Sequence, residues 1–413
     1  MLKKFMADKH FVGLDIGSQA VKAGMIRINE ANQPQLAGVY ELKTSGFRKG
    51  SVSDIGELTE CVHSALNGLS QSTGIKIKEV ILGIDGNLIE KRLSNAIIPL
   101  TDRGNKVVTN QDIKKVHYQA RLLGVNMEEL VIHDFPQYYK VDDAHMALNP
   151  VGLYARKLEV QSLLLVAKNT LIKNITKAIN QAGFDVMELV LSSIASADVA
   201  LNVDQKRDGV VLVDIGSGLT DIVIYKDGLL RYLENIPLGG ENVTRAIAEK
   251  LDLALDLAED IKQSYAVAIG VESNTEEEIL VKRDDGYVPI KKDIICQAIE
   301  PVVDDIVSSI LASIKRSGLY EQINVGMVMV GGGALLPGLI ERVEATSNLP
   351  AKMGRVALTL DKIHHAAKFS SAIGLAQIGV AKSASFASNS NGHPTNWRNF
   401  VASRVKELYQ EYF

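Results

Sequence analysis

Two stretches of the sequence decide the fold: Val12-Gly-Leu-Asp-Ile-Gly-Ser18 and, much later in the chain, Leu212-Val-Asp-Ile-Gly-Ser217. In each, a short apolar run ends in Asp-Ile-Gly-Ser, and a second apolar run follows within a few residues. This pattern predicts a β-hairpin with a glycine at its tip. Because the whole strand–turn–strand unit recurs, and not only four letters, the sequence predicts a fold built from two related halves.

The two hairpin tips have the composition of phosphate-binding loops. Consecutive backbone N–H groups in a turn converge on an anion, glycine leaves room for the anion to approach, and hydroxyl groups add donors. Asp15 and Asp214 carry the same sign of charge as a phosphate, so we expect them to hold a hydrated Mg²⁺ ion, while Lys22 adds a charge contact. The loop residues expected at the nucleotide are Asp15, Gly17, Ser18, Gln19, Lys22, Asp214, Gly216, Ser217, Gly218 and Thr220.

The alternative interpretation of each Asp-Ile-Gly is a plain hairpin turn, because short glycine motifs have low specificity. Two copies at matching positions, together with the turn Gly331-Gly-Gly333 after a later apolar strand, make this alternative the weaker one. We expect the two loops to face each other and to clamp a polyphosphate between the two halves.

The composition limits the class of protein. The 413 residues are enough for two to four domains, and 46% hydrophobic with 23% charged residues is typical of a soluble globular chain. A net charge of -4 does not indicate nucleic-acid binding, for which a strongly basic domain is expected. The two cysteines, Cys61 and Cys296, predict neither a disulfide framework nor a zinc site. Without a recognisable signal peptide or spanning segment, we expect a cytoplasmic protein that is at most peripherally held to a membrane.

Between the repeated hairpins the pattern changes. Short strand-like pieces alternate with one helix that Thr109 introduces, which predicts a small α+β insertion. The predicted fold class is therefore α/β, with two duplicated halves and this insertion. The predicted division is 1–85 and 369–382 for the first half, 86–168 for the insertion, 169–368 for the second half, 383–395 for a flexible linker and 396–413 for a final helix.

The sequence resembles the superfamily of actins, sugar kinases and heat-shock chaperones, and the two loops are similar to its phosphate-1 and phosphate-2 motifs. Val330-Gly-Gly-Gly-Ala-Leu-Leu-Pro-Gly338 resembles the adenosine motif, in which glycines let the nucleoside lie against the backbone. Gly239-Gly-Glu241 and Ala258-Glu-Asp-Ile-Lys262 resemble the segments that flank the base and the ribose. The resemblance implies two actin-like, ribonuclease H-like ATPase domains that bind ATP and Mg²⁺. It adds these expected nucleotide contacts: Gly239, Gly240, Glu241, Lys262, Gly331, Gly332 and Gly333.

Within this superfamily, the sequence most resembles the FtsA family of bacterial cell-division actins. His133-Asp-Phe-Pro-Gln-Tyr-Tyr139 and Asn149-Pro-Val-Gly-Leu-Tyr-Ala-Arg-Lys-Leu-Glu159 are similar to a signature of the extra FtsA subdomain. A linker followed by a terminal helix is the second shared feature. The resemblance implies an ATP-binding protein that self-associates into filaments and tethers FtsZ to the inner face of the cytoplasmic membrane at the division site. It also implies other division proteins as partners.

The predicted catalytic power is low. Leu191-Ser-Ser-Ile-Ala-Ser196 has no Glu or Gln where other bacterial actins place the group that activates water. The catalytic residues are therefore unknown, and we expect slow hydrolysis or nucleotide binding alone. The first loop with Lys22 is also similar to PilM, which leaves a PilM-like scaffold of a type IV pilus or secretion machine as an alternative. A small-molecule kinase is a third candidate, but the first half offers no clear catalytic aspartate.

The last residues form an amphipathic helical pattern after the Ser/Asn-rich linker. On a helical wheel one face is apolar and the opposite face is largely polar, which is typical of a helix that lies in a membrane interface. The alternative is a helix that packs on the body of the protein or on a partner protein. The residues expected to bind the membrane are Trp397, Phe400, Val401, Val405, Leu408 and Tyr412.

Overall fold

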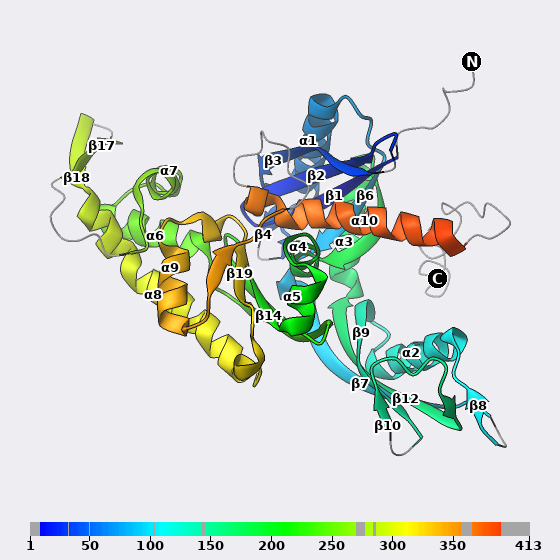
Figure 1. Ribbon diagram of the computed structural model, residues 1–413. Coiled ribbons are helices and arrows are strands. Elements are labelled where there is room, and N and C mark those ends of the chain that lie inside the picture. Colours follow the sequence, from blue (N-terminus) through cyan, green and yellow to red (C-terminus); the bar gives the residue numbers. More distant parts are fainter. Residues whose placement is uncertain are drawn as a thin grey trace.

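The computed structural model describes residues 9–31, 33–48, 50–101, 104–142, 145–269, 277–283, 286–356 and 366–389. It contains two five-stranded sheets, and a smaller unit projects from the first one (Figure 1). The strand order is β13-β6-β1-β2-β3 in the first sheet and β20-β19-β14-β15-β16 in the second. In both sheets an antiparallel three-stranded meander is extended by two parallel strands. This match confirms the predicted duplication.

The first half is built around the first hairpin. Its sheet consists of β1 (His10–Ile16), β2 (Ala20–Ile28), β3 (Pro34–Lys43), β6 (Glu79–Ile84) and β13 (Asp185–Leu191). A short ribbon of β4 (Phe47–Arg48) and β5 (Ser51–Val52) precedes the helices α1 (Ile55–Thr73) and α3 (Asn169–Gln181), and α10 (Ser370–Asn389) comes from the far end of the chain.

The helices of the first half cover both faces of its sheet (Figure 1). Side chains alternate along β6, so Leu82 joins the core under α1 and α3, whereas Ile81 joins the core under α10. Gly13 of β1 lies directly beneath α10, because a Cβ there would be 2.1 Å from the carbonyl oxygen of Ala372. This close approach brings the start of α10 to the tip of the first hairpin.

The second half repeats this plan around the second hairpin. Its strands are β14 (Val210–Ile215), β15 (Thr220–Lys226), β16 (Leu229–Ile236), β19 (Gly326–Val330) and β20 (Ala351–Met353). Its helices are α6 (Gly240–Leu251), α7 (Leu255–Tyr265), α8 (Lys292–Arg316) and α9 (Leu339–Ser347), and a ribbon of β17 (Glu278–Arg283) and β18 (Gly286–Lys291) precedes α8. Helices α4 (Ser192–Ala200) and α5 (Val203–Asp208) connect the two halves.

The insertion is an antiparallel sheet with one helix. Its strands are β7 (Ile89–Pro99), β9 (Glu129–Val141), β10 (His145–Ala147) and β12 (Lys157–Lys168), with a small ribbon of β8 (Lys106–Val107) and β11 (Tyr154–Ala155). Helix α2 (Asn110–Gly124) packs on the sheet, and Thr109 forms a capping box with Asp112 at its start. The α+β insertion that the sequence predicts is therefore present.

Two boundaries differ from the prediction. We expected the second half to begin at residue 169, but α3 packs on the first half, and β13 completes the first sheet by pairing in parallel with β6. Such a distant pairing leaves no local pattern in the sequence. Helix α10 continues to Asn389, so the first residues of the expected linker at 383–395 are helical. The expected membrane-binding segment 396–413 lies outside the described residues. No described helix is both long and apolar enough to cross a membrane.

Candidate functional site

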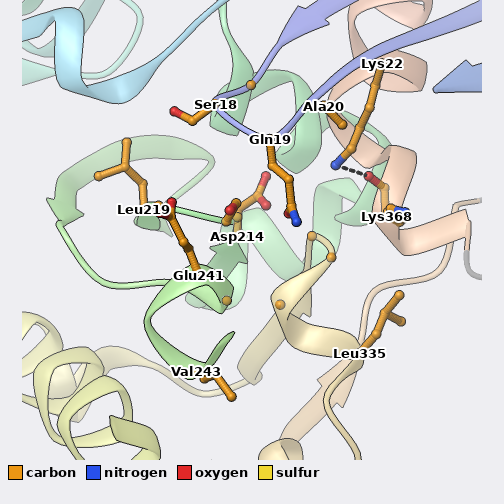
Figure 2. A pocket seen from close by; sticks show the side chains of 18 of the residues that line it. Ser18, Gln19, Ala20, Lys22, Asp214, Leu219, Glu241, Val243, Leu335 and Lys368 are labelled. Atoms are coloured by element: carbon orange, nitrogen blue, oxygen red, sulfur yellow. Dashed lines mark hydrogen bonds between the residues drawn. The ribbon is translucent and has the colours of Figure 1, made fainter. Parts of the chain in front are cut away.

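A cleft of about 1620 Å³ lies between the two halves, with one hairpin tip on each side. Figure 2 shows Gln19 and Lys22 of the first hairpin extending toward the side on which Asp214 of the second hairpin lies. Every expected nucleotide contact lines this cleft except Thr220 and Gly239. Thr220 is fully buried, and its hydroxyl donates to a backbone carbonyl of its own half. Gly239 lies behind the second loop, where a Cβ would be 2.4 Å from the carbonyl oxygen of Ser217.

The two loops close in the same way. The N–H of Gly17 donates to the carbonyl oxygen of Ala20 (3.1 Å), and the N–H of Gly216 donates to that of Leu219 (2.8 Å). The loops are therefore structural equivalents, and the same positions of each turn line the cleft.

Each loop begins with an aspartate whose carboxylate accepts hydrogen bonds from serine. Ser192 Oγ donates to Asp15 Oδ1 (2.7 Å), and Ser371 Oγ donates to Asp15 Oδ2 (2.6 Å). Ser196 Oγ donates to Asp214 Oδ2 (2.6 Å). Burial raises the pKa of Asp214, the charge of Asp15 adds to this rise, and the hydrogen bond from Ser196 opposes it. The sequence did not predict any of these three serines as partners.

Two further carboxyl groups, which the sequence analysis missed, line the same cleft. Asp85 follows β6, and burial raises its pKa to about 6. Asp221 lies opposite Asp214 in the second hairpin, and burial together with the charge of Asp214 raises its pKa to about 8. Asn235 Nδ2 donates to Asp221 Oδ1 (2.6 Å). The sequence contained a clue to each residue. Asp85 directly follows a buried strand, and Asp221 matches the position of Lys22 in the first hairpin.

The two lysines that the sequence analysis expected at the nucleotide have protein partners. Lys22 Nζ donates to the backbone carbonyl of Lys368 (3.0 Å; Figure 2). Lys262 Nζ donates to the carbonyl oxygen of Gly240 (3.0 Å), which ties α7 to α6, and to Glu259 Oε2 (2.7 Å) on its own helix. These bonds hold both ammonium groups at the wall of the cleft. Glu241 likewise pairs with a neighbouring arginine on its own helix.

The three glycines after β19 have different tasks. A Cβ at Gly331, where φ is +87°, would lie 2.4 Å from the carbonyl oxygen of Ile215, and one at Gly333 would lie 2.4 Å from Ile215 Cγ2. Both glycines therefore allow this turn to pack on the second loop, and since both also line the cleft, their contact with the nucleoside stays a prediction. A Cβ placed at Gly332 would have Cγ of Lys368, at 3.8 Å, as its one contact within 4 Å among the described residues beyond its chain neighbours, so this glycine leaves space toward the cleft.

Comparison with known sequences identifies the family. Residues 211–374 match the family described as "Cell division protein FtsA", and residues 86–166 match the "SHS2 domain inserted in FTSA". A cell division protein FtsA from Pseudomonas aeruginosa is 30% identical over 348 residues, which cover 84% of this chain and 83% of that protein. This chain belongs to the FtsA family. An FtsA from Borreliella burgdorferi is 28% identical over 90% of this chain and 91% of its own length.

Solved structures show the actin-like fold of this FtsA-family protein. A chain of the PilM-PilN type IV pilus biogenesis complex matches with a TM-score of 0.66 at 18% identity. The match covers 91% of this chain and 99% of the matched chain. MreB5 of Spiroplasma citri bound to ADP has a TM-score of 0.52 at 13% identity and covers 91% of this chain and 98% of that chain. The SHS2 match runs from just before β7 into β12, so the insertion is the SHS2 domain of the FtsA family.

The cleft of this FtsA-family protein fits a polyphosphate with a hydrated cation. Among the described residues, apart from the two chain neighbours, no atom lies within 4 Å of a Cβ placed at Gly218, so the tip of the second loop faces open space. In the part of the chain that the structure describes, no three His, Cys, Asp or Glu side chains are grouped closely enough to hold a metal ion. Mg²⁺ takes many of its ligands from water and phosphate. Asp15 and Asp214 therefore suit a cation that keeps most of its waters.

Proposed function

We propose that this FtsA-family protein binds ATP with Mg²⁺ in the cleft, self-associates, and tethers FtsZ filaments to the inner face of the cytoplasmic membrane during cell division. The observation that carries the nucleotide part is the pair of equivalent loops that face one cavity, each headed by a serine-bonded carboxylate. The FtsZ and membrane parts rest on family membership and on the amphipathic pattern of 396–413.

In this proposal the chain binds and orients the nucleotide. Backbone N–H groups of the two glycine-containing turns hold the phosphates, and Ser18 and Ser217 add hydroxyl donors. Asp15 and Asp214 hold the waters of the cation, while Gly332 leaves room beside the nucleoside. Bound ATP would supply the phosphates that the two loops would hold. We infer at most slow hydrolysis, because α4 places serines, and no Glu or Gln, at the two aspartates.

The nucleotide site is tested with Asp214→Ala. Loss of a carboxylate that holds the cation should weaken binding of a fluorescent ATP analogue in Mg²⁺ by about 100-fold. Affinity equal to that of the wild type would remove the site assignment.

The tether is tested by liposome co-sedimentation of the full chain and of a chain truncated after Thr395. We expect only the full chain to sediment with anionic vesicles and to carry FtsZ filaments with it, because one interfacial helix binds weakly and an assembly binds through many. If the full chain also stays in the supernatant, with and without ATP, the membrane part of the proposal fails.

A second candidate is a PilM-like scaffold, which the TM-score of 0.66 to the PilM-PilN complex favours at the level of fold. The same sedimentation assay separates the two candidates. A chain that binds a pilus-assembly peptide but leaves FtsZ filaments in the supernatant would support the scaffold.

A further inference from the structure

Helix α4 joins the two halves and reaches both phosphate loops. It follows β13 of the first sheet and leads through α5 to β14 of the second. Ser192 and Ser196 stand one turn apart on this helix, and residues at that spacing share a face. Ser192 donates to Asp15 of the first half and Ser196 donates to Asp214 of the second, with 2.7 and 2.6 Å between the oxygen atoms. One short helix therefore carries a donor for the carboxylate of each loop.

The helix is held in place by its neighbours. At its start, the N–H of Leu191 donates to Nε2 of His133 in the insertion (3.0 Å). In its middle, α10 approaches so closely that a Cβ at Gly374 would lie 1.9 Å from the carbonyl oxygen of Ala195. Helix α10 also supplies Ser371, which donates to the second oxygen of Asp15. Because α4 has contacts of this kind on both sides, its two hydroxyl groups are presented at fixed positions.

The bonds that these serines make differ from those that serines in helices often make. A serine inside a helix commonly donates to the carbonyl one turn earlier, whereas Ser192 and Ser196 donate to carboxylates. Hydrogen bonds to ionised acceptors are shorter and stronger than neutral ones. Partners of this kind orient the side chains that hold a metal ion.

We propose that Ser192 and Ser196 are positioning residues that aim the two loop aspartates at the cation of a bound Mg²⁺–nucleotide. This inference rests on the proposed nucleotide site and adds two residues to it. Because one nine-residue helix carries both hydroxyls, the helix also sets the spacing of two carboxylates that belong to different halves. The segment Leu191–Ser196, which has no Glu or Gln to activate water, would thus position the aspartates of the same site.

The test compares the affinity of a fluorescent ATP analogue for the full chain in Mg²⁺ and in EDTA. Ser192→Ala and Ser196→Ala should each reduce the Mg²⁺-dependent gain in affinity about tenfold, as loss of an outer partner of a metal ligand does. Their affinity in EDTA should stay within about twofold of the wild type, since the phosphate contacts of the loops remain.

The chain offers a matched control and a rescue. Ser193 lies between the two serines, is fully buried, and its Oγ has no hydrogen-bond partner among the described residues. Ser193→Ala therefore removes a hydroxyl from the same helix without changing a bond to either aspartate. It should keep the Mg²⁺-dependent gain in affinity of the wild type. Ser192→Thr keeps a hydroxyl at a half-buried position and should keep most of the gain that Ser192→Ala loses.

The outcomes separate this inference from the proposal beneath it. If both alanine variants keep the full Mg²⁺-dependent gain, the positioning role is wrong and the nucleotide site stands. If the wild-type chain binds no ATP, the nucleotide site fails and the positioning role fails with it. Circular dichroism checks folding, and if Ser196→Ala proves unfolded, the Ala and Thr variants of Ser192 decide the matter.

Discussion

The two phosphate hairpins share one backbone design but differ in charge at a matched position. In the first hairpin the cross-strand partner of Asp15 is Lys22, whereas in the second the partner of Asp214 is Asp221. The tips close with the same hydrogen bond, and both leading aspartates accept from serines. The first hairpin thus brings one charge of each sign to the cleft, and the second brings two carboxyl groups.

This difference changes the electrostatics of the two loops. Carboxyl groups that lie close together in a buried site raise each other's pKa. The pKa of Asp221 accordingly rises to about 8, mainly through burial and then through Asp214, so near pH 7 this group keeps its proton without a cation. The first hairpin carries a cation in Lys22, whose charge lowers the pKa of Asp214 in the second hairpin. The duplicated fold therefore places a loop with an ammonium group opposite a loop with two carboxyl groups.

The largest effect is expected from making the first hairpin resemble the second. Lys22→Asp removes the bond to the backbone of Lys368 and adds a further carboxylate near Asp15 and Asp214. We expect ATP affinity in Mg²⁺ to fall about 100-fold, or about 2.7 kcal/mol, because like charges and a lost cation both oppose phosphate binding. Titration with a fluorescent analogue measures the change.

Lys22→Met is the control for this substitution, because it keeps a long side chain without its charge. It should weaken binding about tenfold. A Lys22→Asp chain with wild-type affinity would show that the charge difference between the hairpins has no bearing on the nucleotide.

A smaller effect, on stability, is expected from removing the second carboxyl group with Asp221→Asn. In the folded chain this carboxyl has a pKa of about 8, against an ordinary value of 3.8. Between these values the folded state binds more protons than the unfolded state, so wild-type stability falls as the pH rises. Asp221→Asn lacks this carboxyl group, so its stability does not fall with pH for this reason. We expect it to be nearly as stable as the wild type at pH 4 and to gain on the wild type as the pH rises to 8, by at most about 1.4 kcal/mol per pH unit, the limit that one proton sets.

Urea denaturation at pH 4, 6 and 8, without nucleotide or metal, measures this difference. A gap that stays constant across the pH range would contradict the prediction, because it would come from packing at Asn235 and not from a proton. The pH dependence of the gap thus isolates the carboxyl pair of the second hairpin.

The hairpins themselves could be predicted because strand, turn and glycine signals are local and occur twice. The groups that hold their aspartates could not. Ser371 lies 356 positions from Asp15, and only the packing of α10 on the first sheet brings them together. The place of β13 depends on a parallel pairing with β6 across a whole inserted domain. Asp221 could have been predicted from the sequence, because an alignment of the two hairpins places it opposite Lys22.

The smallest effect is expected where the loops differ in one side chain at the tip. Gln19 of the first loop corresponds to Gly218 of the second, whose φ is not in the left-handed region and whose Cβ position is open. Gly218→Ala should therefore leave the free energy of unfolding equal or raise it by less than about 1 kcal/mol. The new methyl group enters the cleft and should lower ATP affinity by less than about tenfold. Denaturation without nucleotide and titration with it separate these effects. Lost stability would show that the second loop needs its glycine for the fold, whereas lost affinity in an intact fold would place the phosphate against the backbone of Gly218.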